Sequence, residues 1–271
     1  MATDQELVEQ LEHVWRSVHA LGVELTEAQW KTPTEVPGWT VQDNLVHLSA
    51  LESRLLGRPE PTHQIPDGLA HVKNDFGHSN EIFVDSRRAW SGAAALAEFD
   101  EVTGERLAFV HGYGPDDFGA DSWTPVGPGT VRDLLPFRIF DAWVHEQDMR
   151  RAVDRPGDLD GPAADAALAR ILITMPFVIG KQVAPPEGST VVFDLSPPLP
   201  GRAAVRMEGR ARRLDEMPAT PTVTVTTDGE TFTRLACGRS DPASVLASGA
   251  VTFGGDAALG RRVVESLNFL F

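Results

Sequence analysis

The spacing of apolar residues changes near residue 160, and this change limits the folds open to the chain. Before that point apolar residues recur at steps of three and four, the spacing of amphipathic helices. After it, short runs alternate apolar and polar side chains as half-buried strands do, most plainly TVTVTT at residues 222–227. We therefore predict an α domain over residues 1–160 and a smaller α+β domain over residues 161–271.

Four long helical segments are predicted in the first domain. They cover residues 4–30, 40–56, 75–111 with a break or kink at Ser91-Gly92, and 130–153. Threonine with aspartate three residues later marks two of the starts, at Thr40 and Thr130, as in a capping box. Four helices with one apolar stripe each imply a four-helix bundle.

The second domain is predicted to begin with a helix and to continue with strands and short helices. The helices are placed at residues 163–182, 230–236, 242–247 and 257–268, and the strands at residues 190–195, 203–208, 222–227 and 250–253. The intervening segments are rich in Pro, Gly and charged residues, which favours turns.

Charge and composition narrow the possible partners and the compartment. The formal net charge of −15 lies entirely in residues 1–160, which hold 28 acidic and 13 basic residues. Such a surface repels phosphate, so neither nucleic acid nor a membrane is expected as a partner, and no uninterrupted apolar run approaches 18 residues. The single cysteine, Cys237, and an N-terminus without a signal pattern indicate a cytoplasmic protein. We expect a monomer or a homodimer. The 21 Arg against 3 Lys indicate a GC-rich genome, such as an actinobacterial one.

Three side chains of the predicted bundle have the spacing of a metal site. Asp141 and His145 are four residues apart and share one helix face, and His47 lies two turns into another helix. Two imidazoles and a carboxylate suit Zn²⁺ and tolerate Ni²⁺, Fe²⁺ or Mn²⁺, and three protein ligands leave a position open for catalysis. Asp148 is placed to orient His145. The competing interpretation is an ordinary ion pair and a hydrogen-bonded core histidine.

Two motifs favour the metal interpretation. VPGWTVQDNLVHL at residues 36–48 resembles the signature of DinB-like metalloenzymes, and within them the mycothiol-dependent maleylpyruvate isomerase family. FDAWVHEQD at residues 140–148 resembles the second motif of that family. The resemblance implies that the family's His, Glu, His metal triad corresponds to His47, Asp141 and His145, with the shorter Asp in place of Glu.

The resemblance also implies a cofactor, further site residues and a C-terminal fold. In the family a metal ion binds the sulfur of mycothiol and lowers its pKa. Arg138 and Asp148 are then candidate catalytic residues, with Arg138 holding a substrate carboxylate, while Arg87 and Trp39 are candidate cofactor-binding residues. TFTRLACGR at residues 231–239 resembles the sterol-carrier-like domain fused to such bundles, which we expect to close the active site.

Three classes of function remain open at this stage. The first is a metal- and mycothiol-dependent enzyme that transfers sulfur to, or isomerises, a small electrophilic substrate. The second is a metal-dependent hydrolase or lyase that uses no thiol. The third is a non-catalytic protein that holds a small apolar ligand. An arginine cluster at the metal would favour the first class, and a pocket without positive charge the third.

Overall fold

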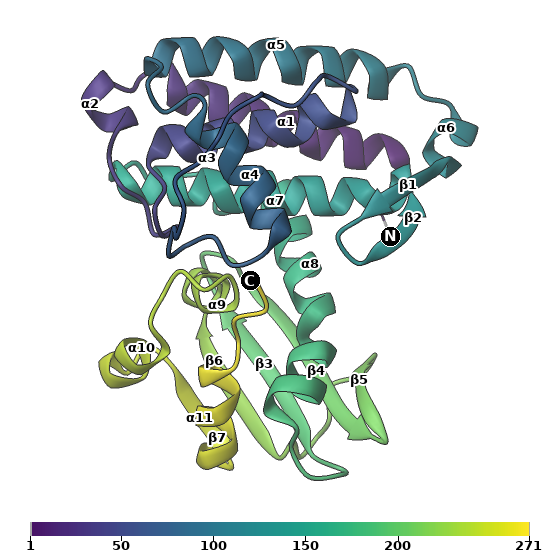
Figure 1. The fold of residues 1–271 in the computed structure, drawn as a ribbon. Coiled ribbons are helices and arrows are strands. Elements are labelled where there is room, and N and C mark those ends of the chain that lie inside the picture. Colours follow the sequence, from purple (N-terminus) through teal and green to yellow (C-terminus); the bar gives the residue numbers. More distant parts are fainter. Residues whose placement is uncertain (1, 271) are drawn as a thin grey trace. The chain divides into compact units, whose positions relative to one another are not determined.

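The computed structural model describes residues 2–270 and divides the chain into two compact units, residues 1–158 and 159–271. The first unit is a helical bundle with one short hairpin, and the second is a five-stranded sheet with helices (Figure 1). The predicted class, an α domain followed by an α+β domain, is confirmed.

Four long helices form the bundle of the first unit. They are α1 (Asp4–Gly22), α3 (Val41–Leu55), α5 (Gly92–His111) and α7 (Val131–Ala152). α1 packs against α5 and α7, and α3 packs against the same two helices, so α1 and α3 occupy opposite corners. Leu11, Leu45 and Leu135 are at most 1% exposed in the shared core, where apolar burial holds the helices together.

Local capping begins the two helices that carry the candidate ligands. The Asp43 carboxylate accepts a hydrogen bond from the backbone N–H of Thr40, and the Thr40 hydroxyl accepts one from the Asp43 N–H. Thr130 and Asp133 form the same reciprocal pair at the start of α7. Both predicted capping boxes are confirmed, and each satisfies two backbone donors that the first helical turn leaves without partners.

The first helix is shorter than predicted, because it ends at Gly22 and not near residue 30. A separate four-residue helix, α2 (Glu27–Trp30), follows with its own capping box, in which Thr26 and Gln29 exchange hydrogen bonds. The apolar spacing continues through Leu25, and this continuity masked the new helix start.

The predicted break at Ser91-Gly92 is confirmed, since Ser91 is the N-cap of α5. The preceding helix, α4 (Asp75–Asp85), ends earlier than expected and packs on α3. A Cβ atom at position 92 would lie 1.9 Å from the Trp30 ring, so only glycine lets that indole pack against the start of α5. The backbone N–H of Gly92 also donates to Glu27.

The sequence analysis placed no helix or strand between residues 111 and 130, and the structure corrects this. It contains α6 (Pro115–Gly119) and a hairpin of β1 (Asp121–Thr124) and β2 (Gly127–Thr130), paired antiparallel. Both strands have four residues, of which only Thr124 is buried, and they show none of the apolar alternation that marks a half-buried strand.

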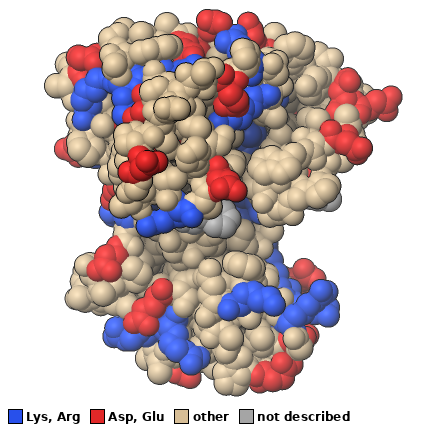
Figure 2. Space-filling model, in the orientation of Figure 1, with Lys and Arg blue, Asp and Glu red and all other residues tan. Residues whose placement is uncertain are grey.

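Charged side chains of the first unit lie scattered on the face shown in Figure 2, with acidic groups among basic ones. Ion pairs also join the segments after α3 and α4 to α5, as between Arg58 and Glu101 and between Arg87 and Glu98. The acidic excess of this part of the chain is therefore spread out on that face.

The second unit contains a helix pair, a sheet and three shorter helices. Its helices are α8 (Pro162–Phe177), the π-helical continuation η1 (Val178–Val183), α9 (Gly229–Ala236), α10 (Pro242–Ser248) and α11 (Ala257–Glu265). Its strands are β3 (Thr190–Ser196), β4 (Gly201–Glu208), β5 (Arg210–Leu214), β6 (Val223–Asp228) and β7 (Thr252–Gly255). The sequence did not predict β5, an edge strand of sequence RARRL with mostly exposed side chains.

The strands are ordered β5-β4-β3-β6-β7, and only the central pair, β3 and β6, is parallel. Val223 and Val225 alternate with threonines along β6 and are buried, as the TVTVTT pattern predicts. Phe193 of β3 packs against Phe232 of α9, with ring centroids 5.4 Å apart, in a core separate from that of the bundle.

One segment of the second unit, Pro162–Val183, is long and apolar enough to cross a membrane by length and composition. The sequence criterion of an uninterrupted apolar run missed it, because charged residues such as Asp165 and Arg170 interrupt the run. Half of the segment is buried, and α8 packs on β4 and β5. A core helix of a water-soluble domain meets the same criterion, so the segment is weak evidence for a membrane span.

Candidate metal centre

The three predicted ligands meet because α3 packs against α7. One ligand atom from each of His47, Asp141 and His145 lies within 4.8 Å of the others, and this is the one such group of metal-ligating side chains found in residues 2–270. His47 Nε2 lies 3.5 Å from Asp141 Oδ2, and His145 Nε2 lies 3.7 Å from Asp141 Oδ1. Both imidazoles are buried, whereas 26% of the Asp141 side chain is exposed.

These distances fit a divalent ion. Nitrogen and oxygen ligands of a tetrahedral zinc ion, at bond lengths near 2.0–2.1 Å, lie roughly 3.3 Å from one another. The two carboxylate–imidazole pairs therefore need to close by only a few tenths of an ångström, whereas the two imidazole nitrogens lie within 4.8 Å of each other. The shorter Asp141 side chain reaches both imidazoles, so replacing the family's Glu with Asp does not separate the ligands.

The charge states of the ligands also suit metal binding. Burial lowers the pKa of His47 to about 4, although Asp141 opposes the shift, so His47 is neutral and has a free lone pair at pH 7. Burial alone would raise the pKa of Asp141. The neighbouring His47 and the Arg138 guanidinium outweigh it and lower that pKa well below its usual range, so Asp141 is ionised.

Arg138, the predicted binder of a substrate carboxylate, is already paired with two carboxylates of the chain. Its Nε donates to Glu52 Oε1 at 2.7 Å, and one terminal nitrogen donates to Asp141 Oδ2 at 2.8 Å. Glu52 also accepts from Arg106 at 3.1 Å, so a buried row of alternating charges runs from α5 through α3 to Asp141 on α7. The other terminal nitrogen of Arg138 is buried and has no hydrogen-bond partner in the described part of the chain.

Asn44, which the sequence analysis did not single out, is the hydrogen-bond partner of His145. Its Oδ1 lies 2.6 Å from His145 Nδ1, whereas the nearer carboxylate oxygen of Asp148 is 3.5 Å from the same nitrogen. The other oxygen of Asp148 accepts from Arg151 at 2.7 Å. The signal available in the sequence was the position of Asn44, three residues before His47 on the same helix.

Trp39 lies beside both imidazoles. Its ring centroid is 5.0 Å from that of His47 and 5.8 Å from that of His145. The indole nitrogen donates to Glu81 of α4 at 2.9 Å, which fixes the ring over the site. The structure thus brings Trp39 beside two of the three candidate ligands, and its role in binding a cofactor stays a prediction.

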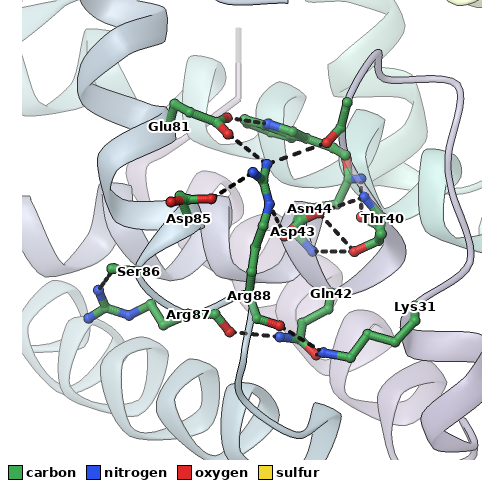
Figure 3. A network of polar contacts seen from close by, with 12 residues as sticks. Lys31, Thr40, Gln42, Asp43, Asn44, Glu81, Asp85, Ser86, Arg87 and Arg88 are labelled. Carbon is green, nitrogen blue, oxygen red and sulfur yellow. Dashed lines mark hydrogen bonds and ion pairs between the residues drawn. The ribbon is translucent and has the colours of Figure 1, made fainter. Parts of the chain in front are cut away.

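Arg87 makes its contacts elsewhere. Its guanidinium is bound twice by Glu98 and lies 3.6 Å from the centre of the Phe83 ring. Figure 3 shows that Arg88, the next residue, extends toward Glu81, Asp85 and Asp43, with which it forms ion pairs. These contacts tie the end of α4 to the first turn of α3, behind the loop that carries Trp39.

The fold and the site together define a class of protein: a helical bundle with a triad of potential metal ligands, followed by an α+β domain. Residues 11–150 match the model of the mycothiol maleylpyruvate isomerase N-terminal domain, and residues 165–262 match that of the MDMPI C-terminal domain. The first match alone covers more than half of the chain. The chain therefore belongs to the mycothiol-dependent maleylpyruvate isomerase family, a family of enzymes.

Two solved structures illustrate the likeness. The crystal structure of a mycothiol-dependent maleylpyruvate isomerase is 16% identical and matches 93% of each chain with a TM-score of 0.56. A histidine-to-alanine variant of that enzyme matches equally widely, with 16% identity and a TM-score of 0.55. At this identity the likeness shows a shared fold. The comparison with curated proteins finds no match.

Proposed function

We propose that this protein is a divalent-metal-dependent enzyme that uses mycothiol to transfer sulfur to, or to isomerise, a small electrophilic substrate. The observation that carries the proposal is the convergence of His47, Asp141 and His145, in a chain whose family is named for a mycothiol-dependent enzyme. We propose zinc as the metal, because two imidazoles and one carboxylate are a common zinc ligand set, with nickel, iron or manganese as alternatives.

The residues of the chain prepare this site for a thiol. When bound, the ion supplies a positive charge that attracts the thiol sulfur and lowers its pKa. His47 contributes a neutral nitrogen ligand, and Asp141 contributes the single negative charge among the three ligands. The buried imidazoles and the Trp39 ring limit the access of water to the ligands.

Of the two candidate arginines, Arg138 supports this proposal and Arg87 does not. Arg138 holds Asp141 in place and keeps one buried nitrogen without a partner in residues 2–270, which supports a contact with an oxygen of the substrate. The guanidinium of Arg87 is occupied by Glu98, so the proposal does not rest on it. We propose that Asp148 acts on His145 only through its charge, because it lies 3.5 Å from the imidazole nitrogen.

Metal analysis of the purified protein tests the site itself. We expect one divalent ion per chain in the wild type, and loss of that ion in a His47→Ala/His145→Ala double variant. The His13→Ala/His19→Ala variant is a matched control, because those two histidines lie on the exposed side of α1. Equal, sub-stoichiometric metal in the wild type and in the His47/His145 variant would refute the proposed ligands.

Mycothiol binding distinguishes the three classes of function. We expect calorimetry to show binding at micromolar concentration or below in the metal-loaded protein, and no binding after the metal is removed. A metal-loaded protein that hydrolyses or cleaves substrates without binding mycothiol would instead be a thiol-independent metalloenzyme. A protein that still binds a small apolar ligand after the metal is removed would instead be a non-catalytic binding protein.

A further inference from the structure

The amide of Asn44 can be oriented from its surroundings. Asn44 lies on α3, is fully buried, and donates through Nδ2 to the backbone oxygen of Thr40 at 2.8 Å and to the Thr34 hydroxyl at 3.0 Å. A backbone carbonyl oxygen can only accept, so the amide nitrogen must face Thr40. The amide oxygen therefore faces the other way, toward α7.

That orientation determines which nitrogen of His145 carries the proton. Asn44 Oδ1 lies 2.6 Å from His145 Nδ1, and an amide oxygen can only accept a hydrogen bond. Nδ1 must then be the donor, which in a neutral imidazole leaves the lone pair on Nε2. Nε2 is the nitrogen that lies 3.7 Å from Asp141, within the group of candidate ligand atoms.

We propose that Asn44 is a positioning residue that fixes the tautomer of His145 and so presents the Nε2 lone pair to the metal. The inference rests on the proposed function in that it assigns this lone pair to a metal. His47 is different, because its Nδ1 is buried and has no hydrogen-bond partner among the described residues. The Nε2 of His47 instead lies 3.5 Å from Asp141 Oδ2, so a carboxylate faces that nitrogen, and the proposal concerns His145 alone.

The use of an amide at this position affects the charge of the site. A carboxylate hydrogen-bonded to a ligating histidine makes the imidazole a more basic ligand. Asn44 holds the same proton without adding a negative charge, and the Asp148 carboxylate is farther from it. A bound ion would therefore keep more of its positive charge, which favours the ionised form of a thiol bound to it.

Two substitutions separate the acceptor atom from the bulk of the side chain. Asn44→Leu removes the acceptor at similar size, whereas Asn44→Asp retains an oxygen that can accept from Nδ1. Asn80→Leu is the matched control, because Asn80 is also a buried asparagine of this unit, and its Oδ1 accepts from Arg54 away from the ligands. Each variant is compared with the wild type by thermal unfolding, zinc titration, and ¹⁵N NMR of the histidine rings in the metal-free protein.

In the wild type we expect the His145 resonances of the form protonated at Nδ1, without metal. Asn44→Leu should shift this tautomer and weaken zinc binding by about 10- to 100-fold, the usual effect of losing the outer partner of a ligating histidine. Asn44→Asp should restore the tautomer and most of the zinc affinity. Asn80→Leu should lower the unfolding temperature and leave tautomer and affinity unchanged.

The proposal is overturned if wild-type His145 carries its proton on Nε2, a result that needs no variant to fold. It is also overturned if Asn44→Leu keeps the wild-type tautomer and zinc affinity, or if Asn80→Leu loses as much affinity as Asn44→Leu. If the wild type shows the expected tautomer but binds no divalent ion, the assignment of the proton stands and the proposed metal-dependent function fails.

Discussion

At the scale of single residues, the geometry of Asp141 is compatible with two roles that the sequence presented as alternatives, an ion pair and a metal ligand. Its Oδ2 accepts from Arg138 at 2.8 Å, so the simple ion pair exists. Its other oxygen, Oδ1, is not the atom that Arg138 contacts, and it lies 3.7 Å from His145 Nε2. A carboxylate has about four acceptor positions, so one pair of oxygens can serve both the guanidinium and an ion. The ion pair holds the carboxylate with Oδ2 3.5 Å from the Nε2 of His47, the other imidazole of the candidate site.

Substitution of Asp141 tests this dual role. Asp141→Ala should lose most of the zinc affinity, because it removes one of three ligands and leaves Arg138 paired only with Glu52, which Arg106 also contacts. Asp141→Glu should retain the metal and change turnover by no more than about tenfold, roughly 1.4 kcal/mol in the barrier. Zinc titration and steady-state kinetics provide the readouts. Wild-type zinc affinity in Asp141→Ala would reduce Asp141 to an ion-pair partner.

A second prediction concerns pH and Glu146. Burial raises the pKa of Glu146 from its ordinary 4.5 to about 8, the nearby Asp158 adds to the shift, and hydrogen bonds from Ser17 and Arg150 oppose it. Between these pKa values the folded chain holds a proton that the unfolded chain has lost. The free energy of unfolding should therefore fall as pH rises from 4.5 to 8, by at most about 1.4 kcal/mol per pH unit.

Glu146→Gln should remove this part of the pH dependence, because the amide is neutral at every pH and can still accept from Ser17 and Arg150. Urea unfolding of the two proteins at pH 5.5, 7 and 8.5 measures it. Glu101→Gln, a change at an exposed residue of α5, is the control. Parallel pH profiles for the wild type and Glu146→Gln would contradict the prediction.

The residues of the site differ in how readily the sequence identifies them. His47, Asp141 and His145 were found because each lies in a short motif with helical spacing. Asn44 was missed as the partner of His145 because 101 positions separate the two residues, and no local pattern joins them. For the same reason Glu52, 86 positions from Arg138, was not recognised as the group that occupies its guanidinium.

At the scale of helices, the buried charges join three of the four long elements of the bundle. Glu52 of α3 forms ion pairs with Arg106 of α5 and with Arg138 of α7, and all three side chains are nearly inaccessible to solvent. Breaking a buried ion pair by removing one partner is typically destabilising by about 3–5 kcal/mol, since the remaining charge stays buried. This network therefore couples helix packing to the position of Asp141.

Glu52→Leu should accordingly lower the free energy of unfolding by roughly 3–5 kcal/mol and also weaken metal binding, because Arg138 loses its anchor. Glu60→Leu, in an exposed pair with Arg54, should change stability by less than about 1 kcal/mol. Urea titrations with and without zinc would measure both effects. A Glu52→Leu protein as stable as the Glu60→Leu protein would show that the buried row of charges does not hold the helices.

The elements that could be predicted are those with local or periodic signals. Thr40 and Thr130 mark the starts of their helices through capping contacts within four residues, and the buried face of β6 is recognisable from its alternating valines. The hairpin of β1 and β2 and the edge strand β5 lack such signals, because almost none of their side chains is fully buried and only pairing with a neighbour makes them strands.

At the scale of the whole molecule, each unit has its own core, and residues 154–161 connect elements without belonging to one. Limited proteolysis should cleave this connection and the segment of residues 58–74, which has no helix or strand, before it cleaves the cores. Residues 115–130 should resist longer than a plain loop would, because they form α6 and the hairpin. Mass spectrometry of the fragments identifies the sites, and early cleavage within α3 or α7 would contradict two independent cores.

A fragment of residues 1–158 should bind metal without the rest of the chain. All three candidate ligands, Asn44, and the row from Arg106 to Asp141 lie within this unit, and the contacts described above join them to residues of the same unit. We expect the fragment to be helical by circular dichroism and to bind one zinc ion with an affinity close to that of the full chain. His47→Ala in the same fragment serves as the control and should bind far more weakly. A folded fragment that binds no zinc, beside a full chain that does, would mean that residues 159–271 supply part of the metal centre.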